Sequence, residues 1–186
     1  MKLVLLILTL NTILYSQNLD PKISINEKLQ NSVLNNKLDE VIELVNNGAE
    51  VNSTDELDGT PLSLASSYGY LEIVKFLIDS GADLNKKDNS GNSSLILACL
   101  NGHSEIVKVL VRNGADINQK GDYNVTALHH AANYGYMEIV KFLLLNGAIP
   151  NEKNLNDNTP ADLAKMSGYI EIYDLLNESS RLNNPK

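Results

Sequence analysis

A spacing of 33 residues recurs along the chain and constrains its fold more than any other feature. Hydroxyl residues keep this spacing, and so do two separate sets of glycines. The three series are Thr60, Ser93, Thr126 and Thr159; Gly69, Gly102, Gly135 and Gly168; and Gly48, Gly81, Gly114 and Gly147. Coincident series at one period indicate a structural unit of that length that is stacked several times.

Each unit has the pattern of two helices. Thr60 and Pro61 are typical of a helix start, because the hydroxyl accepts a free backbone N–H and proline needs no hydrogen-bond acceptor there. We expect this first helix to end near Gly69. Apolar residues then recur at helical spacing over residues 71–78, and Gly81 supplies a left-handed end for a second helix.

The units are joined by tight turns. A residue that tolerates positive φ occurs two positions before each hydroxyl residue of the series. These four residues are Asp58, Gly91, Asn124 and Asp157. We therefore expect the chain to turn sharply there before it enters the next unit.

These motifs resemble the ankyrin repeat family. The resemblance rests on Thr60-Pro61-Leu62, on Thr126-Ala127-Leu128-His129 and on Gly-x-x-Glu-Ile-Val-Lys at 69–75, 102–108 and 135–141. It implies an all-α, ankyrin-type solenoid of stacked helix-turn-helix repeats with short β-turn or hairpin loops. It also implies that the chain binds a partner protein on the concave face of that solenoid.

The repeats divide the chain into consecutive segments. In the first repeat Glu27 replaces the hydroxyl residue and Asn36 replaces the glycine, which suits a terminal repeat with a polar outer face. In the second good repeat Ser94 replaces the usual proline and Ile96 the usual histidine, so we expect a weaker helix start. The expected segments are a signal peptide (1–16), a linker (17–26), a divergent repeat (27–59), three good repeats (60–92, 93–125, 126–158), a partial repeat (159–178) and a flexible tail (179–186).

The first residues have the layout of a secretory signal. A basic residue, Lys2, precedes an uncharged apolar run from Leu3 to Leu10, and the small residue Ser16 lies before Gln17. We expect cleavage after Ser16 and export to the periplasm or the medium. The alternative is an apolar helix that caps the fold, and the polar residues 18–22 argue against it.

Charge and cysteine content narrow the class of partner. Removal of Lys2 from the 15 basic residues leaves 14 against 23 acidic ones, a formal charge of −9. This balance disfavours nucleic acid and anionic membranes, both of which need Lys and Arg contacts. The single cysteine, Cys99, cannot form a disulfide within the chain. We expect a monomer with no membrane anchor after signal cleavage.

A catalytic or metal site would have to use Cys99, His103, His129 and His130. Equivalent positions lie one repeat apart, so these side chains do not form a set of converging ligands. The resemblance gives His129 a structural hydrogen bond and places Cys99 where the family has a small buried residue. An enzyme or metal protein centred on Cys99, His129 and His130 is the weakest alternative. We expect no cofactor and no catalytic activity.

The resemblance also indicates which residues would contact a partner. In this family the concave face is made by the turn tips and the first helices. The residues at the variable positions of these elements are Glu56, Leu57, Ser67, Tyr68, Asn89, Ser90, Asn92, Leu100, Asn101, Asp122, Tyr123, Val125, Asn133 and Tyr134. Tyrosines are enriched at interaction hot spots, although scattered exposed apolar residues are also normal on protein surfaces.

The sequence thus predicts an exported protein–protein interaction module. A second hypothesis uses the same surface but gives the chain a different destination, as a secreted effector or inhibitor of a host protein. The identity of the partner cannot be read from these residues, because a fold does not fix a function.

Overall fold

The structure is a computed structural model that describes residues 23–183. Within that range it contains ten α-helices, one short 3₁₀ helix and no β-strand. The elements are α2 (Ile25–Leu34), α3 (Leu38–Asn46), α4 (Pro61–Tyr68), α5 (Leu71–Asp79), α6 (Ser94–Leu100), α7 (Ser104–Arg112), η1 (Asp122–Asn124), α8 (Ala127–Asn133), α9 (Met137–Leu145), α10 (Pro160–Met166) and α11 (Ile170–Asn183). This arrangement confirms the all-α solenoid of stacked helix pairs.

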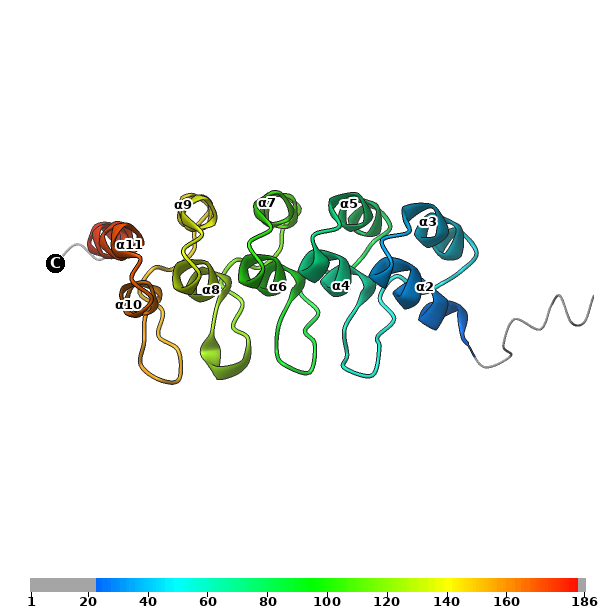
Figure 1. Cartoon of the computed structure of the whole chain (residues 1–186), viewed down its shortest axis with the longest axis horizontal. Coiled ribbons are helices and arrows are strands. Elements are labelled where there is room, and N and C mark those ends of the chain that lie inside the picture. The colour runs from blue at the N-terminus through cyan, green and yellow to red at the C-terminus, as the bar shows by residue number, and fades with distance from the viewer. Residues whose placement is uncertain (1–22, 184–186) are drawn as a thin grey trace, which may run out of the picture.

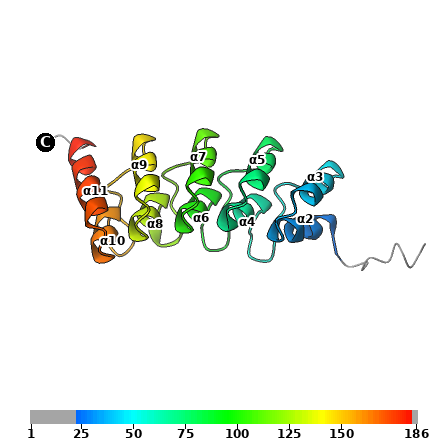
Figure 2. The ribbon, with the colours of Figure 1, turned by 45° about the horizontal axis from the view of Figure 1, so that its top comes forward.

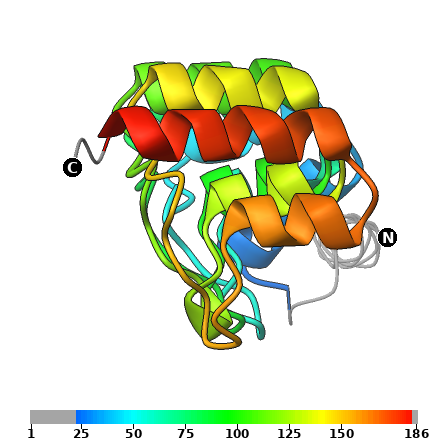
Figure 3. The same ribbon diagram turned by 90° about the vertical axis from the view of Figure 1, so that its left-hand side faces the viewer.

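The helices form two layers with hairpin loops beneath them. The second helices of the repeats, from α3 to α11, lie side by side in one row, and the first helices, from α2 to α10, lie in a parallel row below it (Figure 1). The loops between repeats project away from the first-helix row. The rows keep this order when the molecule is tilted (Figure 2), and an end view shows the loops leaving the helical layers at a steep angle (Figure 3).

The helix starts follow the predicted chemistry, with one exception. The Thr60 hydroxyl accepts the N–H of Ser63 at 3.0 Å, and the Ser63 hydroxyl oxygen accepts the N–H of Thr60 at 2.8 Å. Thr159 and Asp162 form the same reciprocal pair at the start of α10. At α6 the Ser93 side chain makes no capping hydrogen bond. The second good repeat therefore has the weaker start that its sequence indicates.

The core lies between the two helical layers and runs the length of the solenoid. Aliphatic side chains from both helices of each pair meet there and are almost fully buried. The largest of them are Leu29, Leu62, Ile73, Leu77, Leu95, Ile96, Ile106, Leu110, Leu128, Leu143 and Leu176. Because each repeat buries its apolar face against its neighbours, the repeats stabilise one another rather than folding as separate units.

The corner between the two helices of a repeat carries a glycine because the next repeat packs directly on it. Gly102 has φ 75°, and a β-carbon built there would lie 2.7 Å from Cζ of Tyr136 in the following repeat. Gly69 meets His103 in the same way, and the His103 ring nitrogen Nε2 lies 2.9 Å from the carbonyl oxygen of Ser67. Gly69 and Gly102 therefore have no room for a side chain, whereas the equivalent corner of the first repeat carries Asn36 at φ 54° and Gly168 has nothing within 4 Å.

A ladder of asparagines ties the loops together. In each of the first three loops an asparagine carboxamide oxygen accepts the backbone N–H of a residue 31 positions later, in the following repeat. The pairs are Asn52 with Asp83 at 2.8 Å, Asn85 with Asp116 at 2.8 Å and Asn118 with Ile149 at 2.9 Å. These bonds fix the base of each loop against the next loop.

The structure corrects the predicted boundaries at both ends. The first helix begins at Ile25 and is capped by Ser24, whose hydroxyl accepts the N–H of Glu27 at 3.1 Å. Part of the expected linker 17–26 is therefore helical, and Ser24 rather than position 27 supplies the hydroxyl. The expected tail 179–186 was also wrong as far as Asn183, because α11 continues to that residue and completes a two-helix repeat.

The predicted signal peptide, residues 1–16, lies outside the described residues. Within residues 23–183, no helix is both long enough and apolar enough to cross a bilayer.

Candidate partner-binding surface

Three of the four hairpin loops are closed by the same side-chain motif. In the first loop, Oδ1 of Asp55 accepts the N–H groups of Leu57 and Gly59, each at 2.8 Å. Asp88 and Asn154 do the same in the second and fourth loops. A side-chain acceptor of this kind replaces a backbone turn and leaves the following residues free to point outward.

The third loop lacks this acceptor, because Gly121 occupies the equivalent position. Its tip forms the short helix η1 instead, and both Tyr123 (φ 55°) and Asn124 (φ 57°) adopt positive φ. Asparagine tolerates that conformation, whereas a tyrosine there is strained. The Tyr123 ring is nevertheless 69% exposed. Backbone strain at a residue whose side chain is largely exposed is typical of a functional position.

The C-terminal ends of the first helices carry two further exposed tyrosines. Tyr68 on α4 is 55% exposed and stacks on Tyr70 with ring centroids 5.8 Å apart. Tyr134 at the end of α8 is 46% exposed and lies between the rings of His130 and Tyr136, at 6.5 and 6.1 Å. These stacks hold the tyrosine rings in place, so a partner would meet ordered aromatic surfaces.

Polar side chains link neighbouring repeats on the same surface. The Asn101 amide donates to the Ser67 hydroxyl oxygen at 3.2 Å, and the Ser167 hydroxyl donates to the Asn133 carboxamide oxygen at 2.9 Å. These bonds cross between first helices, in parallel with the asparagine ladder of the loops. They leave hydrogen-bonding capacity at both pairs for a bound partner.

The predicted partner-binding residues fall on the loop tips and on the exposed side of the first helices. We call this surface the concave face. Most members are exposed: Glu56, Leu57, Tyr68, Asn89, Ser90, Asn101, Asp122, Tyr123 and Tyr134. The others, Ser67, Asn92, Leu100, Val125 and Asn133, are half-buried between repeats. Leu57 and Tyr123 stand out because each is 69% exposed at a tip.

Sequence reasoning missed three apolar residues of this surface. Leu155 is 66% exposed, and its N–H donates to the carbonyl oxygen of Tyr123 at 2.8 Å, so the two tips adjoin. Met166 and Leu34 are 73% and 40% exposed at the ends of α10 and α2. Each lies a multiple of 33 residues from a predicted member, so extending the same series to the terminal repeats would have found all three.

Cys99 and His129, two residues of the enzyme or metal alternative, are enclosed in the core. Burial raises the pKa of the Cys99 thiol, which is fully enclosed and therefore stays protonated. His129 is also fully buried, with Nδ1 2.9 Å from the Thr126 hydroxyl and Nε2 3.2 Å from the Asn158 carbonyl oxygen. In the range 23–183, no three His, Cys, Asp or Glu side chains are grouped to hold a metal ion.

The pKa values of both histidines are lowered, chiefly because burial disfavours the charged imidazole. A neutral His129 ring with its proton on Nε2 satisfies the hydrogen bonds with Thr126 and Asn158. For His130 the same cause, together with the neighbouring His129, lowers the pKa to about 4. The His130 ring that stacks on Tyr134 is therefore uncharged at neutral pH.

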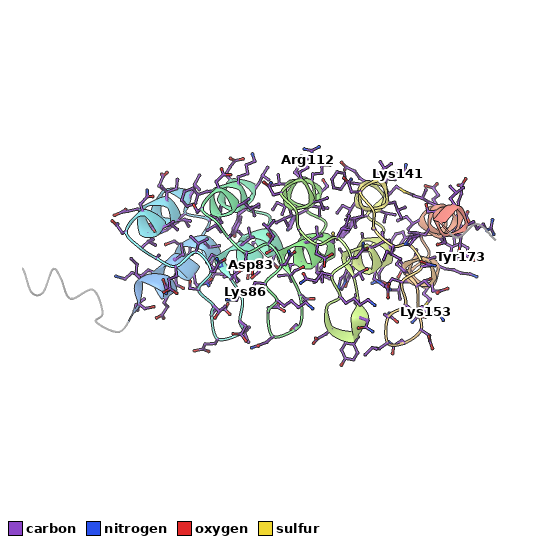
Figure 4. All side chains as sticks on the ribbon, turned by 180° about the vertical axis from the view of Figure 1, so that it is seen from behind. Asp83, Lys86, Arg112, Lys141, Lys153 and Tyr173 are labelled. Atoms are coloured by element: carbon purple, nitrogen blue, oxygen red, sulfur yellow. The ribbon has the colours of Figure 1, made fainter. Side chains whose placement is uncertain are left out.

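Charge is distributed unevenly between the two sides of the solenoid. Helices α4, α6 and α8 contain no Asp, Glu, Lys or Arg. The second helices carry ion pairs instead, such as the Lys108 ammonium with Glu105 at 2.7 Å and with Glu138 at 2.6 Å. Seen from behind, Arg112 and Lys141 lie on the second-helix row, while Lys86 and Lys153 lie towards the loops (Figure 4). The middle of the concave face is thus aromatic, aliphatic and amide in character.

Comparison with known proteins agrees with this geometry. The family described as Ankyrin repeats (3 copies) matches residues 29–121, and the family described as Ankyrin repeats (many copies) matches residues 110–164. A search of the curated proteins finds no match. Ankyrin repeats are protein–protein interaction modules and are typically not enzymes. With its stacked helix pairs, projecting loops and matching repeats, the chain belongs to the ankyrin repeat family.

Proposed function

We propose that the chain is an exported module that binds a partner protein along its concave face. The observation that carries the proposal is the set of exposed aromatic side chains, Tyr68, Tyr123 and Tyr134, together with the first helices α4, α6 and α8, which contain no Asp, Glu, Lys or Arg. Aromatic residues dominate binding energy at protein interfaces, and depletion of charge is typical of the buried centre of an interface.

The opposite side of the solenoid supports the choice of surface. The second helices carry exposed ion pairs that satisfy one another within the chain, such as Lys75 with Glu72 at 2.8 Å. Side chains that already have partners within the chain gain little from a second protein. The concave face, by contrast, offers tyrosine hydroxyls, amides and apolar tips.

The test is a pull-down with the mature chain as bait, made from the extracytoplasmic fraction of the native source. A variant with Tyr68, Tyr123 and Tyr134 changed to alanine is compared with wild type. A matched control changes Leu145→Ala, because Leu145 is 86% exposed on α9 in the second-helix row. We expect a protein that wild type and the control retain and that the folded triple variant loses. Retention by all three baits would contradict the choice of surface.

Export is part of the same proposal and rests on residues 1–16. A basic residue, an apolar run and a small residue before Gln17 follow one another in the order that signal peptides require. The intact mass of the protein recovered from the native source tests this. A mass that begins at Gln17 supports cleavage after Ser16, and a mass that retains Met1 to Ser16 contradicts it.

A further inference from the structure

A hollow at the N-terminal end of the concave face carries an inference that deepens the proposed function and rests on it. The hollow has a volume of about 690 Å³ and lies between α2 and the first hairpin loop. Its lining combines two kinds of side chain. Leu34, Leu57 and Leu64 provide apolar surface, while Glu27, Asp55 and Glu56 provide carboxylates. No Lys or Arg lines it.

The first loop differs in charge from the other loops. Residues 49–59 contain Glu50, Asp55, Glu56 and Asp58 and no basic residue, whereas the second loop contains Lys86 and Lys87. The Lys86 ammonium donates to the carbonyl oxygen of Asn52 in the first loop at 3.0 Å, and Asn52 does not line the hollow. Among residues 23–183, none of the ion pairs involves a carboxylate that lines the hollow. The exposed carboxylates of Glu27 and Glu56 therefore remain available to an external cation.

A buried amide gives a second and independent indication. Gln30 is only 6% exposed, and its Nε2 donates to the carbonyl oxygens of Ser53 and Gly59, each at 3.2 Å. In this way it takes the role that His129 plays in the third good repeat. Its carboxamide oxygen, however, accepts no hydrogen bond within the described part of the chain. A buried acceptor without a donor is costly, and Gln30 is one of the residues that line the hollow.

We propose that the hollow binds a segment of the partner protein in which an arginine is flanked by aliphatic residues. The guanidinium has five N–H donors in a planar fork, which suits the carboxylates of Glu27 and Glu56. The aliphatic neighbours cover Leu34, Leu57 and Leu64. The tyrosines further along the face then contact the rest of the partner.

The probe is a short synthetic peptide, blocked at both ends, in which leucine and arginine alternate, titrated into the full chain at low ionic strength. A peptide of the same length with glutamate in place of arginine is the charge control. Backbone amide NMR reports where each peptide binds. We expect saturable shifts at residues 24–34 and 54–64 with the arginine peptide and none with the glutamate peptide.

Two double variants of equal charge sharpen the test. Glu27→Gln with Glu56→Gln removes the carboxylates of the hollow, and Asp39→Asn with Glu43→Gln removes two exposed carboxylates of α3 in the same repeat. We expect the first pair to raise the Kd of the arginine peptide about fivefold and the second pair to raise it less than about twofold. Equal weakening by both pairs would show nonspecific attraction and overturn the assignment.

The outcomes separate this inference from the proposed function. If the arginine peptide causes no shifts, or binds no better than the glutamate peptide, the assignment of the hollow is wrong. In that case the pull-down with the tyrosine variant still decides whether the concave face binds a partner. If the arginine peptide shifts residues near Tyr68 and Tyr134 instead, the concave face binds but the hollow is not the arginine site.

Discussion

Every repeat contains two kinds of turn, and they tolerate side chains very differently. At the corner between the two helices, the left-handed residues Gly69, Gly102 and Gly135 are each covered by a side chain of the next repeat. At the loop tips the left-handed residues include Asp58, Gly91, Tyr123, Asn124 and Asp157. Packing excludes a side chain at these three corners, whereas the tip is free to carry residues that serve binding.

The largest effect is expected at the corners. Gly102→Ala places a β-carbon at φ 75° and against the Tyr136 ring, so left-handed strain adds to overpacking. We expect a loss of about 2 to 5 kcal/mol in the free energy of unfolding, measured by urea denaturation. Gly114→Ala is the matched control, because Gly114 has φ 94° but nothing within 4 Å. An equal loss in both variants would show that the neighbouring ring imposes no constraint.

A second effect concerns pH and the face of α8 beside Tyr134. The folded pKa of His130, about 4, lies below the ordinary value of 6.5, so the unfolded chain binds more protons between these values. The contribution of neutral His130 to the free energy of unfolding is therefore fully present above pH 6.5 and is lost as the pH decreases to about 4. The loss is at most about 3 kcal/mol, and solvent near the partly exposed ring reduces it.

Urea denaturation of wild type and His130→Gln across this pH range measures the contribution, because the carboxylates are common to both proteins. We expect the difference in stability between the two to change steadily between pH 6.5 and 4. A difference that is constant with pH would mean that His130 is as easily protonated in the folded chain as in the unfolded one.

A third prediction compares the stability of alanine and glycine variants at two tyrosine positions. At the strained tip, Tyr123→Gly should be more stable than Tyr123→Ala by about 1 kcal/mol, because glycine adopts positive φ without strain. On α4, Tyr68→Ala should be more stable than Tyr68→Gly by a similar amount of about 1 kcal/mol. Thermal unfolding of the four variants compares the two positions. The same order at both would contradict the strained conformation of Tyr123.

The smallest effect is expected where a tip residue has no packing role. Leu57→Ser removes a side chain that is 69% exposed, so stability should change by less than about 0.5 kcal/mol. Partner binding should nevertheless weaken, because the apolar tip is lost. A large loss of stability would instead assign Leu57 to the packing of the first loop.

The sequence alone was enough to predict the repeat architecture. The 33-residue series that contains Thr60 marks the starts of the first helices, and the series that contains Gly69 marks the corners between the two helices of a repeat. The positive φ at Asp58, Gly91, Asn124 and Asp157 was predicted for the same reason. Periodic positions are predictable because each repeat meets the same neighbours.

Features that break the period could not be predicted in this way. Ser24 caps α2 from outside the series, three positions before the place where the period puts the hydroxyl residue. The strain at Tyr123 follows from the missing acceptor at Gly121, and the hollow beside Gln30 needs the loop and α2 to be placed together. Leu34 and Met166, the terminal members of the concave face, could have been predicted by extending the 33-residue series to the first and last repeats.

The most direct test of the account places a photo-crosslinking phenylalanine analogue at single positions of the mature chain. One protein carries it at Tyr123 on the concave face, and the other carries it at Leu145 in the second-helix row. Both are irradiated in the native extracytoplasmic fraction. We expect one discrete adduct from position 123 and none from position 145. An adduct from position 145 alone would place the partner on the opposite side of the solenoid and would contradict binding on the concave face.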